Sequence, residues 1–331
     1  MKIVFPVISL ETEGGARFIS QLANALLDKG HQVEIVIPEN NVISWPVRAK
    51  ITRVEALTPS AIPSCDFILP NFFTTVLPVW ESKKGQVVRL SLGYEPLWVK
   101  DADLAKQTYL LGAPIITISQ WHRQVLFNHT GLNSTVVSPG VDTSVFHPYS
   151  KLSTKIGRKT VFFIVRSVPH GYTWKGTEEF FEAGRRLKKF YPDFEIYVVV
   201  TEQIPFQSPI PCLIKTANTD IEMAQNYAQA DLFVYASSFE AFGLPPLEAM
   251  ACGTAVITTD CGGIRDYAKH GTNCLIVPPK DVGQLTSAMY RLLNNDQERQ
   301  RLAVTGLHHA QSWTWKRTVD QVEALLLSLK H

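Results

Sequence analysis

The chain has 331 residues, of which 45% are hydrophobic and 19% are charged, and its formal net charge is +2. The length suits two globular domains that each bury a core, and so small a net charge does not suggest a nucleic-acid-binding protein. No apolar run is long enough to span a membrane, and the N-terminus reads as a strand entering a polar loop, so no signal peptide is expected.

The chain contains five cysteines, and no two of them form a C-x-x-C pair. Reduced cysteines in apolar surroundings pack as small hydrophobic side chains. This cysteine usage is typical of a reducing compartment. We therefore expect a cytoplasmic protein, and peripheral contact with the inner face of the membrane stays open.

Short apolar runs alternate with amphipathic helical stretches along the first half of the chain. This alternation is typical of α/β domains with parallel sheets. The predicted strands of the first half are Ile3–Ile8, Gln32–Ile37, Phe67–Leu69, Val87–Leu90, Ile115–Ile118 and Thr135–Val137. A helix is predicted over Ala16–Lys29, where apolar residues recur at helical spacing, with Gly30 as its C-terminal cap.

The second half repeats the same plan. Its predicted strands are Thr160–Val165, Glu195–Val200, Leu232–Tyr235 and Ala255–Thr258. Its predicted helices are Thr177–Phe190, Asp220–Gln229, Pro246–Ala251, Val282–Asn294 and Asp296–Gln311. The polar and basic segment 149–159 lies between the two halves, and we interpret it as a linker.

The run Ser237–Ala251 reads SSFEAFGLPPLEAMA and carries two carboxylates, Glu240 and Glu248. Gly243 permits close backbone approach, and prolines are tolerated in a first helical turn, whose free N–H groups can bind a diphosphate. Glu240 is expected in the loop after the strand Leu232–Tyr235, and Glu248 in the first turn of the following helix. Both carboxylates are therefore predicted to face one crevice, although an acidic residue in a first turn also has a structural explanation.

This run resembles the E-x7-E signature of retaining glycosyltransferases of family 4 (GT4), which have the two-domain GT-B fold. Three further segments resemble that family in the same order. They are the glycine loop and helix at Glu13–Pro38, the end of the first domain at Val136–Pro148, and the phosphate-binding segment at Val165–Leu187.

The resemblance implies an α/β fold of two Rossmann-like domains, with parallel sheets that face each other across a deep interdomain cleft. It implies an N-terminal acceptor domain at residues 1–148 and a donor domain for the nucleotide sugar at residues 160–312. The last helical segment, 313–331, is expected to pack back on the first domain. Docking of this segment on its own domain is the alternative.

Transfer of a glycosyl group from a nucleoside diphosphate requires stabilisation of the negative charge that develops on the departing phosphate. By resemblance, Arg166 and Lys175 form the phosphate-binding pair, and Glu240 lies near the transferred sugar. These three are the predicted catalytic residues. The resemblance also implies retention of the anomeric configuration without a metal ion, and no metal-ligand spacing stands out in the sequence.

The predicted donor-binding residues are Gly14, Gly15, Phe242, Gly243, Leu244 and Glu248. Glu248 is expected to accept hydrogen bonds from ribose hydroxyls, and the backbone amides of residues 242–244 are expected to meet the sugar and the phosphate. The glycine pair would permit close approach from the first domain, with a tight turn as the alternative. No cofactor is expected, and the substrate is a nucleoside-diphosphate sugar, with UDP favoured and dTDP as the alternative.

Tyr94 stands where many members of the family have a histidine, and with Glu95 it is expected to contact sugar or acceptor, packing being the alternative. The run Tyr94–Trp121 resembles a subgroup associated with rhamnose-containing surface polysaccharides. His122 is interpreted as a surface or capping residue. The basic residues of the helix at 177–190 are candidates for contact with anionic lipid, with a solvated helix face as the alternative.

The sequence therefore predicts a glycosyltransferase of polysaccharide biosynthesis, with a glycan, a lipid-linked saccharide or a small molecule as acceptor. Two alternatives stay open. One is a sugar-nucleotide epimerase or a phosphorylase on a related two-domain fold, and the other is a non-catalytic protein that binds sugar nucleotides. No nucleic-acid partner is expected, and the sequence does not indicate an oligomeric state.

Overall fold

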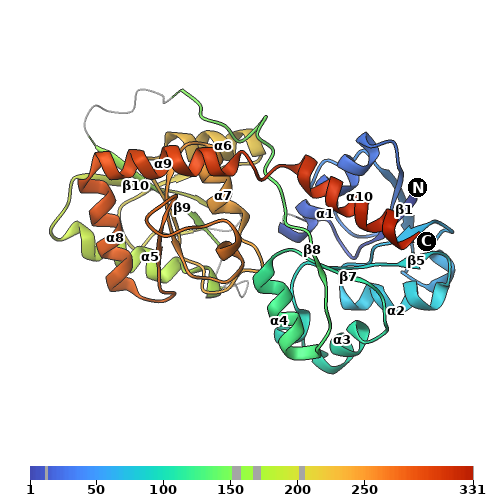
Figure 1. The fold of residues 1–331 in the computed structure, drawn as a ribbon. Coiled ribbons are helices and arrows are strands. Elements are labelled where there is room, and N and C mark those ends of the chain that lie inside the picture. Colours follow the sequence, from blue (N-terminus) through green and yellow to red (C-terminus); the bar gives the residue numbers. More distant parts are fainter. Residues whose placement is uncertain (12–13, 151–157, 167–172, 201–205, 331) are drawn as a thin grey trace. The chain divides into compact units, whose positions relative to one another are not determined.

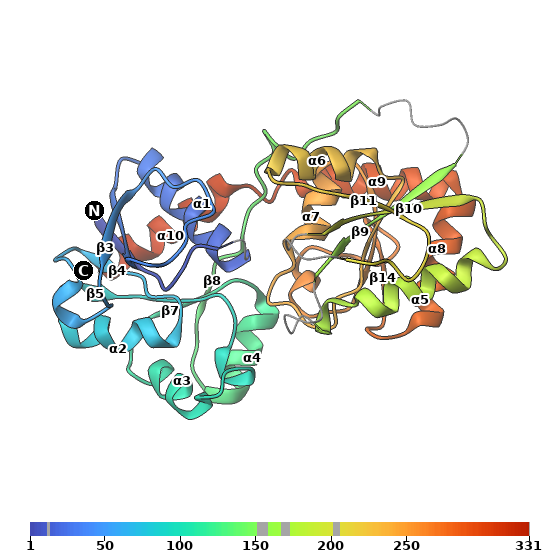
Figure 2. The same ribbon diagram turned by 180° about the vertical axis from the view of Figure 1, so that it is seen from behind.

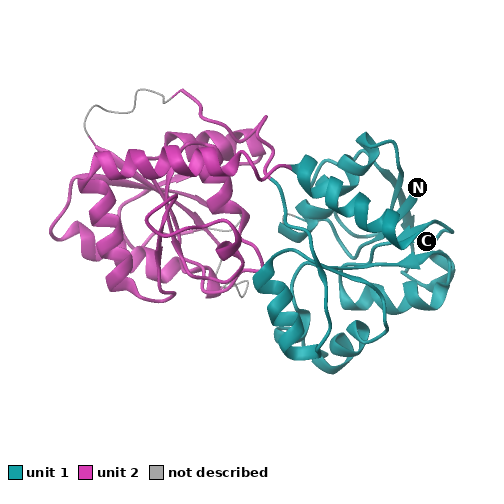
Figure 3. Ribbon diagram, viewed as in Figure 1, with its two compact units in different colours: residues 1–140, 315–331 teal, residues 141–314 magenta. Residues whose placement is uncertain are grey.

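The computed structural model describes residues 1–11, 14–150, 158–166, 173–200 and 206–330. The chain divides into two compact units, shown in different colours in Figure 3. Unit 1 contains residues 1–140 and 315–331, and unit 2 contains residues 141–314. The predicted end of the first domain, Pro148, thus lies within unit 2. The predicted linker falls largely outside the described residues.

Unit 1 is built on a five-stranded sheet in which every pair of neighbours is parallel. In sheet order the strands are β3 (Lys50–Val54), β2 (Gln32–Pro38), β1 (Lys2–Pro6), β4 (Phe67–Ile68) and β5 (Gln86–Val87). The central strands β1 and β2 are almost fully buried, as expected for a parallel sheet covered on both faces. Strand β3 was not predicted, because its sequence KITRV is largely exposed and lacks an apolar run.

A second sheet of unit 1 has three parallel strands, β6 (Arg89–Ser91), β7 (Ile115–Thr117) and β8 (Thr135–Val136). The single strand predicted at Val87–Leu90 is therefore wrong, since the run is divided between β5 and β6. The amide of Val88 donates to a carbonyl of β4, whereas the amide of Arg89 donates to Pro114 beside β7. Consecutive residues thus bond to different sheets.

The helices of unit 1 lie on both faces of these sheets (Figures 1 and 2). They are α1 (Gly14–Asp28), α2 (Phe73–Ser82), α3 (Ala102–Tyr109), α4 (Gln120–Thr130) and α10 (Trp315–Leu329). The last helix packs on the first. The rings of Phe18 and Trp315 are 5.5 Å apart, and Lys29 forms an ion pair of 2.7 Å with Glu323.

Unit 2 is built on a six-stranded sheet that is parallel throughout. In sheet order the strands are β11 (Leu213–Lys215), β10 (Phe194–Val200), β9 (Lys159–Val165), β12 (Leu232–Tyr235), β13 (Ala255–Thr259) and β14 (Leu275–Val277). The four inner strands lie where the sequence predicts them. The two edge strands were missed because each has only three residues, too few to show a pattern.

Helices cover both faces of this sheet (Figures 1 and 2). They are α5 (Thr177–Lys188), α6 (Asp220–Gln229), α7 (Leu244–Ala251), α8 (Val282–Asn294) and α9 (Asp296–Ala310). The core includes the stacked rings of Phe163 on β9 and Phe180 on α5, whose centroids are 4.1 Å apart. Within the described parts of the chain, no helix is both long and apolar enough to cross a membrane.

Candidate functional site in unit 2

The candidate site lies at the carboxyl ends of the neighbouring parallel strands β9 and β12. Ligands of open parallel sheets bind at this edge, because the loops that leave the strands converge there. The loop after β12 contains Glu240 and leads to Gly243, which caps the N-terminus of α7. The loop after β9 begins at Arg166 and ends in the short 3-10 turn Thr173–Lys175 before α5.

Glu240 and Lys175 meet in this structure, although 65 residues separate them in the chain. The ammonium Nζ of Lys175 donates to Oε1 of Glu240 at 2.7 Å, and the pair is partly shielded from solvent. The hydroxyl of Tyr235 donates to the same carboxylate oxygen at 2.6 Å. A cation and an anion therefore lie side by side at the strand ends.

The backbone of Glu240 is held on both sides by the loop that follows β13. Its amide donates to the carbonyl of Cys261 at 2.7 Å, and its own carbonyl accepts from the amide of Gly263 at 2.8 Å. A Cβ atom at Gly263 would lie 2.1 Å from the carbonyl oxygen of Ala241, so only glycine fits. The position of the acidic residue is thus fixed by main-chain contacts.

Gly176 brings the two loops together. It has a φ of 73°, and a Cβ atom there would lie 2.1 Å from the carbonyl oxygen of Ala236. Next to it, the amide of Ser238 donates to the carbonyl of Trp174 at 2.7 Å. Because the backbones are in direct contact, the side chain of Lys175 can reach Glu240.

Arg166 is the first residue after β9, and its carbonyl accepts a hydrogen bond from the hydroxyl of Thr177 at 3.3 Å. The backbone of Arg166 therefore lies next to the start of α5, just beyond the end of β9, the strand that pairs with β12. Residues 167–172 of the same predicted phosphate-binding segment lie outside the described residues. The predicted pairing of Arg166 with a phosphate stays a prediction.

Gly243 has a φ of 83°, in the left-handed region that favours glycine. A Cβ atom there would also lie 2.7 Å from Cγ2 of Ile264, and the hydroxyl of Tyr267 donates to the carbonyl of Gly243. The ring of Phe242 is buried between those of Tyr267 and Trp313. These contacts define the start of α7 at Leu244. Pro245 and Pro246 follow and carry no backbone N–H, so the amides at this helix start are those of Gly243 and Leu244.

Glu248 lies in the second turn of α7 and not in its first. The helix begins at Leu244, so its first turn holds no acidic residue. The side chain of Glu248 is buried, and its Oε2 accepts a hydrogen bond from the hydroxyl of Tyr227 at 3.1 Å. The predicted placement of Glu248 in the first turn was therefore wrong, because the helix starts two residues before the predicted Pro246. Ribose binding by Glu248 stays a prediction.

Gly14 and Gly15 are the first two residues of α1, which starts two residues before the predicted Ala16. Neither glycine has a positive φ. A Cβ atom at Gly14 would meet nothing within 4 Å, whereas one at Gly15 would lie 3.3 Å from Cδ1 of Leu92. These glycines belong to a helix start and not to a loop, and their role toward a donor stays a prediction.

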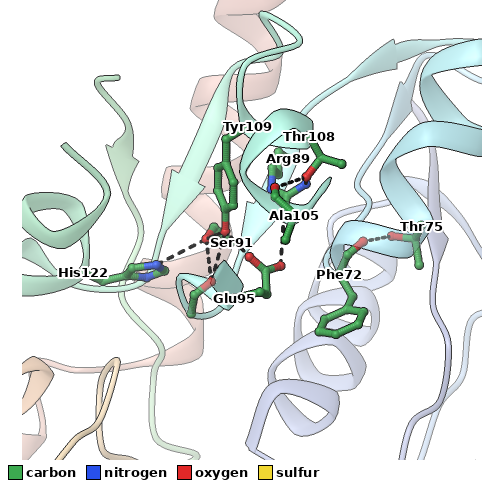
Figure 4. A network of polar contacts seen from close by, with 10 residues as sticks. Phe72, Thr75, Arg89, Ser91, Glu95, Ala105, Thr108, Tyr109 and His122 are labelled. Atoms are coloured by element: carbon green, nitrogen blue, oxygen red, sulfur yellow. Dashed lines mark hydrogen bonds and ion pairs between the residues drawn. The ribbon is translucent and has the colours of Figure 1, made fainter. Parts of the chain in front are cut away.

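Tyr94 and Glu95 are both buried in unit 1. Figure 4 shows Glu95 among its polar neighbours. Glu95 forms a buried ion pair of 3.0 Å with Arg89 and also accepts from the hydroxyl of Tyr109. The ring of Tyr94 stacks on that of His129, with centroids 5.0 Å apart. These contacts give no support to a role of either residue in binding sugar or acceptor. The ring of Tyr94 has a packing role, which was the alternative.

The sequence did not predict this polar network. The guanidinium of Arg89 also donates to the hydroxyl of Thr108, and the hydroxyl of Ser91 lies 3.3 Å from Nε2 of His122 (Figure 4). His122 is 1% exposed, and burial lowers the pKa of its imidazole to about 3. The interpretation of His122 as a surface or capping residue was wrong. Its Nδ1 has no hydrogen-bond partner within the described ranges.

The basic residues of α5 are engaged in local contacts. Arg185 and Arg186 both form ion pairs with Glu182, at 2.6 and 2.7 Å, and Lys188 donates to backbone carbonyls of Pro192 and Phe194. This arrangement favours the solvated helix face over contact with lipid. Across the described ranges of the chain, no group of three or more His, Cys, Asp or Glu side chains could hold a metal ion.

Comparison with known proteins finds a family match in unit 2. Residues 212–309 match the family model described as "Glycosyl transferases group 1". This segment of the chain is therefore similar to that family. The matched segment includes both Glu240 and Glu248, whereas Arg166 and Lys175 precede it.

Curated relatives of this chain include a D-inositol 3-phosphate glycosyltransferase of Corynebacterium urealyticum, 27% identical over 59% of this chain and 51% of that protein. An MMP α-(1→4)-mannosyltransferase of Mycolicibacterium hassiacum is 28% identical over 57% of this chain and 47% of that protein. The chain thus spans about half the length of these relatives.

Solved structures match this chain over nearly its full length. Sucrose-phosphate synthase from Thermosynechococcus elongatus has a TM-score of 0.83 at 18% identity, with 99% of both chains covered. HepE of Anabaena in complex with UDP-glucose has a TM-score of 0.80 at 18% identity, covering 99% of this chain and 100% of that one. The predicted GT-B class is confirmed at the level of the fold.

Proposed function

We propose that this protein transfers a glycosyl group from a nucleoside-diphosphate sugar to an acceptor, with retention of configuration and without a metal ion. The observation that carries the proposal is the Lys175–Glu240 pair at the carboxyl ends of parallel strands, next to the N-terminus of α7. The match of residues 212–309 to the glycosyl transferases group 1 model supports the reaction class. The UDP-glucose complex of the structurally similar HepE supports UDP as the nucleotide to test first.

Each residue has a chemical role in this proposal. The cationic side chains of Lys175 and Arg166 stabilise the charge that grows on the diphosphate as the glycosidic bond breaks. The backbone amides of Gly243 and Leu244 bind phosphate oxygens, because the first N–H groups of a helix have no partner within it and the following Pro245 and Pro246 have no N–H. Glu240 accepts a hydrogen bond from the transferred sugar, and Glu248 meets the ribose. The acceptor is a glycan, a lipid-linked saccharide or a small molecule.

Ligand-detected NMR with UDP-, dTDP-, GDP- and ADP-sugars tests the donor site. Lys175→Ala and Glu248→Ala are expected to weaken binding of the preferred nucleotide. Lys159→Ala is the matched control, since Lys159 lies at the amino end of the same strand β9, paired with Asp296 on the surface. If no sugar nucleotide binds, or if Lys159→Ala weakens binding as much as Lys175→Ala does, the site assignment is wrong.

Turnover distinguishes transfer from binding alone. With the preferred donor and a panel of saccharide acceptors, proton NMR of the product reports whether the anomeric configuration is retained. An epimerised nucleotide sugar, or a sugar phosphate formed from a glycan and phosphate, would instead identify one of the alternative enzyme classes. Nucleotide binding without any product would leave the non-catalytic alternative.

A further inference from the structure

We propose that Tyr235 is a positioning residue for Glu240, which it holds so that one carboxylate oxygen serves the protein and the other serves the donor sugar. This inference rests on the proposed function, in which Glu240 contacts the transferred glycosyl group. The sequence analysis predicted no role in the reaction for Tyr235.

The hydrogen bonds of the Glu240 carboxylate are divided unequally. Oε1 accepts from the hydroxyl of Tyr235 at 2.6 Å and from Nζ of Lys175 at 2.7 Å. Oε2 accepts no hydrogen bond from any residue in the described parts of the chain. An ionised carboxylate has acceptor positions on both oxygens, so Oε2 keeps its full capacity for a ligand. A sugar hydroxyl is a donor of the right kind.

Tyr235 is placed to act as a permanent donor. It is the last residue of β12, its ring stacks on that of Phe233, and it is 8% exposed. Burial, reinforced by the nearby Glu240 charge, raises the pKa of the Tyr235 hydroxyl well above its usual value. The hydroxyl therefore stays protonated at any pH used in an assay, and it donates a hydrogen bond to Oε1 of Glu240.

The main chain alone does not fix the direction of the carboxylate. Backbone hydrogen bonds to Cys261 and Gly263 hold the Cα of Glu240, but its side-chain torsions are set by what the carboxylate contacts. Lys175 has a flexible side chain, and in the proposed reaction it also serves the phosphate. Tyr235 is a rigid donor on a buried strand. It can therefore keep Oε1 in place while Lys175 responds to the ligand.

Replacement of Tyr235 by phenylalanine isolates this role, because the ring and its packing remain and only the hydroxyl is lost. Removing a hydrogen bond to a charged group typically costs enough to slow a reaction about ten- to hundredfold. We expect kcat of Tyr235→Phe to fall by about that factor, while KM for the donor changes less than about threefold.

Tyr197→Phe is the matched control. Tyr197 is a buried tyrosine on the nearby strand β10, and its hydroxyl donates to the backbone carbonyl of Asn226 and not to Glu240. This variant loses a buried hydroxyl of the same kind, and we expect kcat to change less than about twofold. Equal losses in Tyr197→Phe and Tyr235→Phe would show a general effect of strand stability and would overturn the proposal.

A double-mutant cycle tests whether Tyr235 acts through Glu240. The dissociation constant of UDP-glucose and kcat are measured for Tyr235→Phe, Glu240→Ala and the double variant, since alanine leaves no acceptor for the Tyr235 hydroxyl. If the two residues act as one unit, Tyr235→Phe changes either quantity less than about twofold once Glu240 is already replaced. If Tyr235→Phe has the same effect in both backgrounds, the proposal is wrong.

A ligand-free crystal structure of Tyr235→Phe separates this inference from the proposed function. A Glu240 carboxylate that has rotated away from its present direction supports positioning by Tyr235, whether or not the wild-type protein turns over a sugar nucleotide. An unmoved Glu240 carboxylate refutes it. Failure of the wild-type protein to bind any of the four sugar nucleotides refutes the proposed function instead.

Discussion

Replacing His122 by glutamine is expected to remove a pH-dependent part of the stability of unit 1. Burial lowers the pKa of His122 to about 3 in the folded protein, whereas an unfolded histidine has a pKa of about 6.5. Between these values the unfolded state binds a proton that the folded state does not. Stability therefore falls as the pH falls from about 6.5 toward 3.

The size of the effect follows from these two pKa values. At pH 7.5 the imidazole is neutral in both states and contributes almost nothing. At pH 5.0, about 1.5 units below the unfolded pKa, protonation of the unfolded state costs about 2 kcal/mol of folding free energy. Glu95 acts in the opposite direction, because burial raises the pKa of its carboxyl group. Its contribution is present in both proteins and cancels in the comparison.

The assay is urea unfolding of the wild type and of His122→Gln at pH 7.5 and pH 5.0. Two compact units need not unfold together, so hydrogen exchange of peptides from β7 and α4 is used to follow unit 1. Glutamine offers a polar atom toward Ser91 and does not titrate. The wild type should lose about 2 kcal/mol more than the variant between the two pH values. Equal losses would refute a buried neutral imidazole.

Three other predictions follow from the structure. Gly176→Ala should destabilise unit 2 by about 3 kcal/mol or more in thermal unfolding, because the backbone there is left-handed and the new Cβ would overlap the Ala236 carbonyl. Gly271→Ala is the control: its φ of 71° is similar but the space around it is open, so it should cost only about 1 kcal/mol. Arg89→Met should destabilise unit 1 by about 3–5 kcal/mol because it leaves the buried Glu95 charge unpaired, and adding Glu95→Leu should restore most of the loss; a double variant no better than the single one contradicts this. Glycosyl transfer should continue at an unchanged rate after treatment with EDTA, and a loss reversed by Mg²⁺ would contradict the proposed metal independence.

Local sequence signals predicted the regular elements of unit 2 well. Helices α6 and α8 have the predicted bounds because the side chains of Thr219 and Asp281 cap their first turns, and such caps are visible in the sequence. Strand β12 is a continuous apolar run, which a buried parallel strand requires. Short or exposed strands such as β3 and β11 could not be found, since their backbone pairing is decided by neighbours far away in the chain.

The candidate site was predicted only in part, for a physical reason. Motif spacing indicated Glu240 and Lys175, but no local pattern could show that they form an ion pair, because Gly176 brings their loops together through a backbone contact. The same holds for Arg89 and Glu95, whose pairing follows from burial of both side chains. Residue types were readable from the sequence, and their mutual orientation was not.

The division of unit 1 into two segments has a consequence for synthesis. Helix α10 leaves the ribosome only after every residue of unit 2, although it covers α1 near the start of the chain. Domains fold largely as units while the chain emerges. Unit 2 can thus complete its sheet before Trp315 is available to pack on Phe18 of α1. Unit 1 is therefore the first unit to be synthesised and the last to complete its fold. Throughout translation of unit 2, the surface of α1 that α10 later covers is exposed and accessible to a chaperone.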